Sequence, residues 1–131
     1  MTGISGIVLS VLRIVAALLL IEHGLTKLIG WPMAQAWPPD VPVYFKYAAI
    51  VLEVGGGAIL AVGLLTRIVA FILSGQMAVA YFMVHEPISF FPVVNQGEPA
   101  ILFCFIFLYV AAAGGGSISL DALRTRRSRR S

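Results

Sequence analysis

Charged residues are scarce in this chain, and their scarcity excludes a soluble fold. Only 11% of its 131 residues are Asp, Glu, Lys or Arg, whereas 60% are hydrophobic and the mean hydropathy is +0.96. A soluble globular domain carries about 25% charged residues. Too few polar side chains are present to cover a particle in water, so we expect a single-domain integral membrane protein.

Cysteine and the common catalytic motifs are also scarce or missing. A single cysteine, Cys104, excludes an internal disulfide and a CxxC pair, and with them thiol–disulfide chemistry that needs two cysteines from this chain. Because Cys104 lies in an apolar run, we expect it to be a packing residue. The triplet Gly55-Gly56-Gly57 is not followed by GK[ST], so it is no phosphate loop, and no Ser/His/Asp order is present.

Four apolar segments are present, at about residues 4–27, 43–65, 66–85 and 99–114. A helix rises 1.5 Å per residue, so about 20 residues cross the roughly 30 Å hydrocarbon core of a bilayer. The intervening segments contain Trp, Phe and Pro, which indicate interfacial loops. The predicted fold is therefore all-α: an integral membrane four-helix bundle over residues 1–116, followed by a basic tail over residues 117–131.

The basic residues predict the orientation of this bundle. Five of the nine are Arg124, Arg126, Arg127, Arg129 and Arg130, and Arg67 falls on the same side of the membrane, between the second and third segments. Lysine and arginine concentrate on the cytoplasmic side, so we expect both termini in the cytoplasm. Lys27 and Lys46 would lie on the opposite side. The arginine run is expected to meet anionic lipid headgroups, not nucleic acid.

Small residues in the second segment predict close helix packing. Gly56, Gly57 and Gly63 fall near the helical face that carries Glu53, and small residues let membrane helices approach closely. Glu53 is therefore expected on the packed side. Arg13, within the first segment, is expected to bind a backbone carbonyl or a lipid phosphate.

The turn between the second and third segments is expected to lie at the membrane surface. Thr66 is predicted to be the N-cap of the third helix, and Arg67 follows it at that surface.

Ionisable residues converge on the non-cytoplasmic side. An intramembrane ionisable group is a functional hypothesis by default. We predict one outward-facing pocket formed by Glu22, His23, Lys27, Glu53, His85 and Glu98.

Three alternatives to that pocket stay open. The Glu22–Lys27 group is equally interpreted as an interfacial polar cluster in which Lys27 reaches towards water. Glu53 serves as a proton relay, pairs with a buried cation such as Lys27, or is protonated and bonded to a backbone carbonyl. His23 and His85 could ligate a haem from two helices, but paired interfacial histidines are common without one, and we expect neither haem nor another metal.

The order and spacing of several short motifs resemble the DoxX family of small four-span bacterial membrane proteins. The motifs are Leu12-Arg13, HGLTK at residues 23–27, E-x-GGG at 53–57, GLLTR at 63–67, His85, Gly97-Glu98, and SLD at 119–121. The likeness covers nearly the whole chain. It implies a four-helix membrane bundle in the bacterial inner membrane. Some related proteins, of the DoxD/DoxA type, are linked to thiosulfate oxidation with quinone as acceptor, and others to complexes that handle thiols and oxidative stress.

Two functional hypotheses follow. The first is an accessory or redox-associated inner-membrane subunit whose outer pocket binds a quinone-like or anionic small molecule. The second is a purely structural small subunit of a larger respiratory or photosynthetic complex. In both, the partners are the lipid bilayer and other membrane subunits or further copies of this chain. Transport is less favoured, because no pair of broken helices is apparent.

Overall fold

The protein is described by a computed structural model that covers residues 3–130. Within that range the structure is entirely helical, with no strand, which confirms the predicted all-α class. The elements are α1 (Gly3–Leu28), α2 (Val43–Ile50), the π-helical segment η1 (Val51–Gly56), α3 (Gly57–Val62), α4 (Thr66–Ala80), the π-helical segment η2 (Tyr81–His85), α5 (Pro92–Asn95), α6 (Glu98–Ala113) and α7 (Leu120–Arg130).

In the described part of the chain, three continuous helical stretches are long and apolar enough to cross a membrane: Gly3–Leu28, Val43–Val62 and Thr66–His85. The apolar helix α6 is shorter. Many large apolar side chains point outwards, including Val51 at 69% exposure, Phe71 at 65% and Phe105 at 64%. Apolar surface on this scale suits contact with lipid chains and is unusual for a protein in water.

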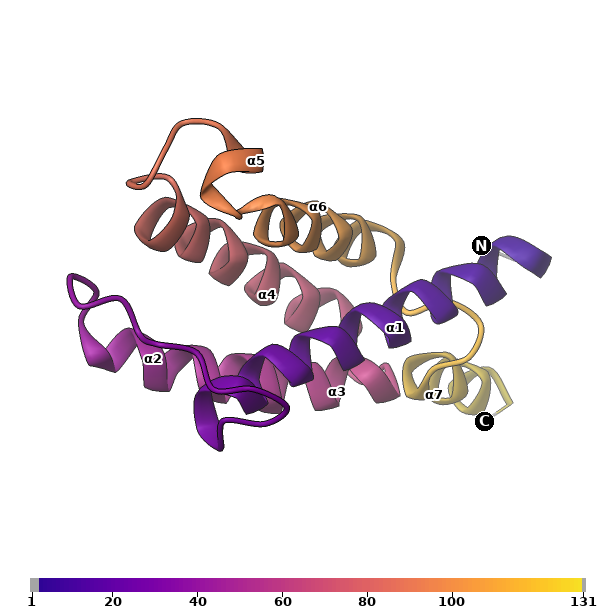
Figure 1. Ribbon diagram of the computed structural model, residues 1–131. Coiled ribbons are helices and arrows are strands. Elements are labelled where there is room, and N and C mark those ends of the chain that lie inside the picture. The colour runs from indigo at the N-terminus through magenta and orange to yellow at the C-terminus, as the bar shows by residue number, and fades with distance from the viewer. Residues whose placement is uncertain (1–2, 131) are drawn as a thin grey trace.

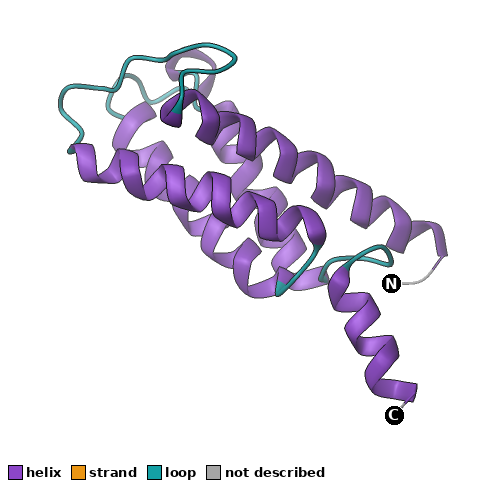
Figure 2. Cartoon of the chain, turned by 90° about the horizontal axis from the view of Figure 1, so that it is seen from below, coloured by secondary structure: helices purple, strands orange, loops and turns teal. Residues whose placement is uncertain are grey.

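The helices pack in pairs (Figure 1). Helix α4 lies along α6, and α1 packs against η1 and α3. Both ends of the described chain lie at one end of the molecule, together with the turn at residues 63–65 and the segment 114–119; we call this the closed end. The loops 29–42 and 86–97 lie at the other end, which we call the loop end (Figure 2).

Glycines permit the close packing of the second stretch, as its small-residue pattern predicts. A Cβ added to Gly56 would lie 3.1 Å from Cδ2 of Leu73, and one added to Gly57 would lie 2.7 Å from Cγ1 of Ile21. Gly63 ends α3 in the left-handed region, with a φ of 73°, which glycine adopts without steric cost.

Arg13 joins three segments at the closed end. Its side chain is only 1% exposed, and its guanidinium donates to the carbonyls of Gly115, Ala61 (3.3 Å) and Ile118 (2.8 Å). Ser10 adds a bond to the carbonyl of Gly115 at 3.0 Å. A charged donor in an apolar interior must be hydrogen-bonded, and here backbone carbonyls supply the acceptors. Of the two partners predicted for Arg13, a backbone carbonyl and a lipid phosphate, the structure shows backbone carbonyls.

The prediction that Thr66 caps α4 is wrong, and the cap comes from the far end of the chain. Leu65, with a φ of 48°, occupies the N-cap position and has no side-chain acceptor, while Thr66 is already helical. The carboxylate of Asp121 instead accepts from the backbone N–H of Leu65 at 2.9 Å and of Thr66 at 2.8 Å. Arg67 donates to the last carbonyls of α6, those of Ala111 (3.4 Å) and Ala112.

Candidate functional site

A cavity of about 790 Å³ lies towards the loop end. Its walls come from α1, α2, η1, α4, η2, the start of α6 and the loop that follows α1. Most of its lining is apolar, with Leu20, Leu52, Met77 and Phe103 among the residues. Ligand sites typically combine an apolar lining with a few placed polar groups. The polar side chains that line this cavity are His23, Lys27, Gln35, Lys46, Glu53, Gln76, His85 and Gln96.

Glu53 holds the polar part of the cavity together. Its side chain is 3% exposed, and its two oxygens have different partners: Lys27 Nζ lies 2.9 Å from Oε1, and Gln76 Nε2 donates to Oε2 at 2.8 Å. Of the alternatives predicted for Glu53, the structure therefore shows the pair with Lys27. The Oε1 atom of Gln76 is buried and has no hydrogen-bond partner within residues 3–130. A buried acceptor without a donor is costly, so this atom favours a hydrogen-bonding ligand.

Both π-helical segments border the cavity. Glu53 lies within η1, and His85 closes η2. A π-helical turn contains more residues than an α-helical one, so it redirects the side chains that follow it, and such turns occur frequently at functional sites. No residue pattern in an apolar segment reveals such a turn in advance.

The two histidines are held in the same way. His23 Nδ1 lies 2.8 Å from the carbonyl oxygen of Leu19, and His85 Nδ1 lies 3.0 Å from that of Asn95. A carbonyl can only accept, so each Nδ1 carries the proton, and in the neutral ring Nε2 remains an acceptor. An aromatic ring also borders each histidine. The ring centroid of Phe103 lies 5.6 Å from that of His23, and the ring centroid of Tyr81 lies 6.3 Å from that of His85.

Asn95 bonds to His85 through its backbone carbonyl, and its side chain fixes the surrounding segment. Its side chain is 2% exposed and donates to the hydroxyl of Tyr81 at 3.2 Å and to the carbonyl of Ser89 at 2.9 Å. Its Oδ1 accepts from the backbone N–H of Gly97 at 2.8 Å. The wall of the cavity at His85 is therefore well ordered by hydrogen bonds.

Lys46 gives the cavity a net positive charge. It lines the cavity from α2 and is half-buried, and no ion pair or hydrogen bond joins it to another residue of the described chain. Lys27, in contrast, is neutralised by Glu53. Lys46 is therefore a cation of the cavity that is available to a ligand.

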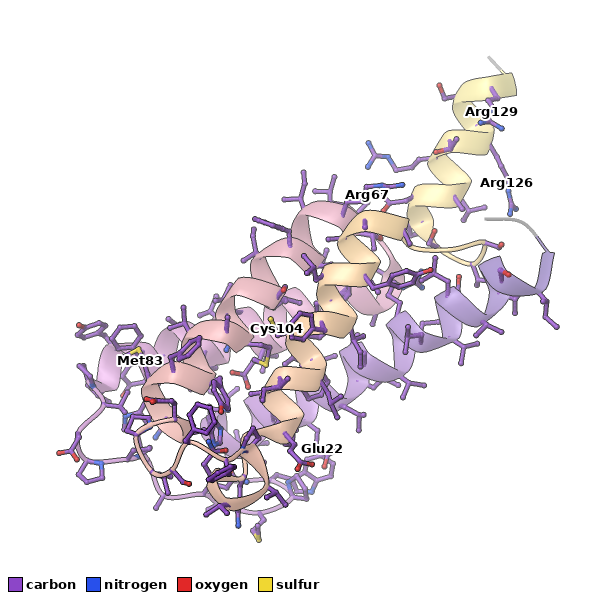
Figure 3. All side chains as sticks on the ribbon, turned by 90° about the horizontal axis from the view of Figure 1, so that it is seen from above. Glu22, Arg67, Met83, Cys104, Arg126 and Arg129 are labelled. Carbon is purple, nitrogen blue, oxygen red and sulfur yellow. The ribbon has the colours of Figure 1, made fainter. Side chains whose placement is uncertain are left out.

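Two of the six predicted pocket residues lie outside this cavity. Glu22 is exposed on the outside of the molecule (Figure 3), because it lies about 100° around α1 from its neighbour His23. Glu98 is exposed in the first turn of α6, where a carboxylate complements the positive end of a helix. His23, Lys27, Glu53 and His85 do line the cavity.

Three residues of the site escape sequence reasoning. In the sequence, Lys46 bears only on the orientation in the membrane. It nevertheless lies seven residues before Glu53 and so on the same helical face. Gln76 is the lone amide side chain of the third segment, which is a usable signal. Asn95 ends the short helix α5, outside the four apolar segments, and no periodicity could have placed it.

A family model and two curated relatives match this chain. The DoxX family model matches residues 8–86. An uncharacterized protein of Haemophilus influenzae is 40% identical over 117 residues, covering 86% of this chain and 87% of its own length. The inner membrane protein YqjF of Escherichia coli is 28% identical over 125 residues, covering 89% of this chain and 92% of its own. No solved structure matches significantly. The chain therefore belongs to the DoxX family of membrane proteins.

Proposed function

We propose that the protein is an accessory or redox-associated subunit of the bacterial inner membrane whose loop-end cavity binds a quinone-like or anionic small molecule. One observation carries this proposal. Lys46 and Gln76 Oε1 are a cationic donor and a buried acceptor that line the same cavity and have no partner within the described chain. A head group with a negative or carbonyl oxygen would accept from Lys46, and a ligand hydroxyl would donate to Gln76.

The proposal includes a topology. The chain would span the membrane four times, with α6 as the fourth span and the basic segment 117–131 as a tail. Both termini would lie in the cytoplasm, because Arg67 and the arginines of α7 gather at the closed end. The cavity would then open on the opposite side of the membrane. The relative named as an inner membrane protein supports the choice of membrane.

Native mass spectrometry from lipid nanodiscs tests the binding proposal. The wild-type protein is expected to retain a small molecule that Lys46→Gln loses, because that change removes the unpaired cation proposed to bind the head group. Glu22→Gln is the control, since it removes a charge one residue from His23 but outside the cavity. A wild-type protein without a bound molecule, or equal retention in both variants, would contradict the proposal.

A structural subunit is the second candidate, and the loop before α6 favours it. Five apolar side chains of this loop are highly exposed outside any long helix: Ile88 at 68%, Phe90 at 78%, Phe91 at 61%, Val93 at 77% and Val94 at 61%. Such a patch suits a protein partner or the membrane interface. Stable co-purification with one larger complex, abolished by Phe90→Ser but not by Glu53→Gln, would favour this candidate over the first.

A further inference from the structure

The cavity reaches the flank of the helices as well as the loop end. At the loop end its rim includes Gln35 and Gln96. On the flank it is lined by Ala48 of α2 and by Ile72 and Val79 of α4, and all three are exposed; the isoleucine is 49% and the valine 50% exposed. Side chains that both line a cavity and face outwards mark an opening. Both helices belong to stretches long and apolar enough to cross a membrane, so this opening would face lipid.

The opening is bordered by small residues, and one of them, Gly75, has free space beside it. Ala48, Ala49, Gly75 and Ala80 all line the cavity on this side. A Cβ added to Gly75 would meet no atom within 4 Å. Figure 1 shows α2 diverging from α4 towards the loop end, while α4 stays alongside α6. The cavity is therefore open between α2 and α4, because exposed residues of both helices line it.

Polarity changes along the path from this opening inwards. The flank presents Ala49, Ile72 and Val79, whereas the groups able to bind a polar head, Lys46 and Gln76, lie on the same two helices within the cavity. On α2 and η1, Lys46, Ala49 and Glu53 follow one another at helical spacing on one face. A ligand that matched both parts would have an apolar chain and a polar head.

We propose that the ligand of the loop-end cavity is an amphiphile dissolved in the bilayer, which reaches the cavity sideways between α2 and α4. This inference rests on the proposed function of the cavity. Its chain lies against Ala49 and Gly75, and its head meets Lys46 and Gln76. A water-soluble molecule with the same head reaches the cavity from the loop end and does not pass Gly75.

The test compares two glycines in the purified protein in nanodiscs. Gly55 and Gly75 both have open space at the Cβ position and both are exposed in helices, but only Gly75 lines the cavity. Gly75→Phe is expected to fill the opening, and Gly55→Phe is the matched control. The probes are a dimethoxy-methyl-benzoquinone with a decyl chain and the same quinone without it, together with decyl phosphate and methyl phosphate as an anionic pair.

Gly75→Phe should weaken binding of the chain-bearing probe at least about tenfold and leave the chainless probe within about twofold, while Gly55→Phe changes neither. The selectivity follows from the two paths, because the phenyl ring would occupy the space proposed for the decyl chain, whereas the chainless head enters from the loop end. Ala49→Phe, on the opposite wall, should reproduce the effect and guards against a Gly75 variant that does not fold.

Other outcomes overturn the inference in distinguishable ways. If neither head binds to the wild-type protein, the proposed pocket fails and the lateral path fails with it. If the probes bind but Gly75→Phe affects both equally or neither, the pocket stands and the lateral path is wrong. If Gly75→Phe instead converts a dimer into monomers by native mass, the opening is an interface between copies of this chain.

Discussion

The two ends of the molecule use their charged side chains differently. At the closed end, Arg13, Arg67 and Asp121 each bond to the backbone of a distant segment. At the loop end, Lys27 and Glu53 bond to each other, and Lys46 has no described partner. Charges bound to backbone atoms fix the path of the chain, whereas an unpaired charge beside a cavity is available to a ligand. We therefore assign the closed end to folding and the loop end to binding.

The largest effect is expected from removing Arg13. Arg13→Met would leave three backbone carbonyls, one of them in a fully buried bond, without their charged donor, and hydrogen bonds to charged groups contribute about 1.5–3 kcal/mol each. We expect a loss of about 3 kcal/mol or more in the free energy of unfolding, measured by titration of mixed micelles with a denaturing detergent. Arg127→Met, an exposed position on α7, is the control. Equal stability of the two variants would refute the structural role of Arg13.

Removing one partner of the Lys27–Glu53 pair should lower the free energy of unfolding by nearly as much as removing Arg13. Removing both partners should lower it much less. Lys27→Met leaves the buried carboxylate of Glu53 without its cation, and an uncompensated buried charge costs on the order of 3 kcal/mol. Adding Glu53→Gln should recover most of that loss, because the charge is then gone. A double-mutant cycle in the same unfolding assay measures the coupling, and purely additive effects would show that the pair is unimportant.

Asp121 should make a smaller contribution that depends on pH. Burial raises the pKa of Asp121, but hydrogen bonds from Thr66 and Leu65 and the nearby Arg124 outweigh it and bring the pKa below its usual value. A lowered pKa in the folded protein means that the ionised group stabilises the fold above its unfolded pKa, and that this stability is lost as the pH falls through the folded pKa. Asp121→Asn should cost about 1 kcal/mol at neutral pH.

The check on Asp121 is the thermal unfolding temperature measured from neutral to acid pH. The difference between the wild-type protein and Asp121→Asn should shrink as the carboxyl group is protonated. A difference that stays constant with pH would mean that the carboxylate charge is not what caps α4.

The helices were predictable because apolar length and turn residues determine them locally. The glycine face of the second segment also followed from spacing alone. The partner of Arg13 did not, because the carbonyls of Gly115 and Ile118 lie more than a hundred residues away in sequence. The cap on α4 escaped prediction for the same reason, since Asp121 reaches it from the start of α7.

The site was only partly predictable. Acids and histidines at segment ends pointed to the end where the cavity lies, but Glu22 and Glu98 are exposed outside it, since the side that a terminal residue faces depends on the rotation of each helix. Lys46 and Gln76 could not be assigned to the site from the sequence, because only the structure shows that α2 and α4 border one cavity.

One variant, Lys46→Gln, tests the division between the two ends most directly. Its stability and its retained ligand should be measured on the same nanodisc preparation, by detergent titration and by native mass spectrometry. Our account predicts unchanged stability together with loss of the bound small molecule. A variant that is strongly destabilised, or one that keeps the ligand in full, would contradict the assignment of the loop end to binding.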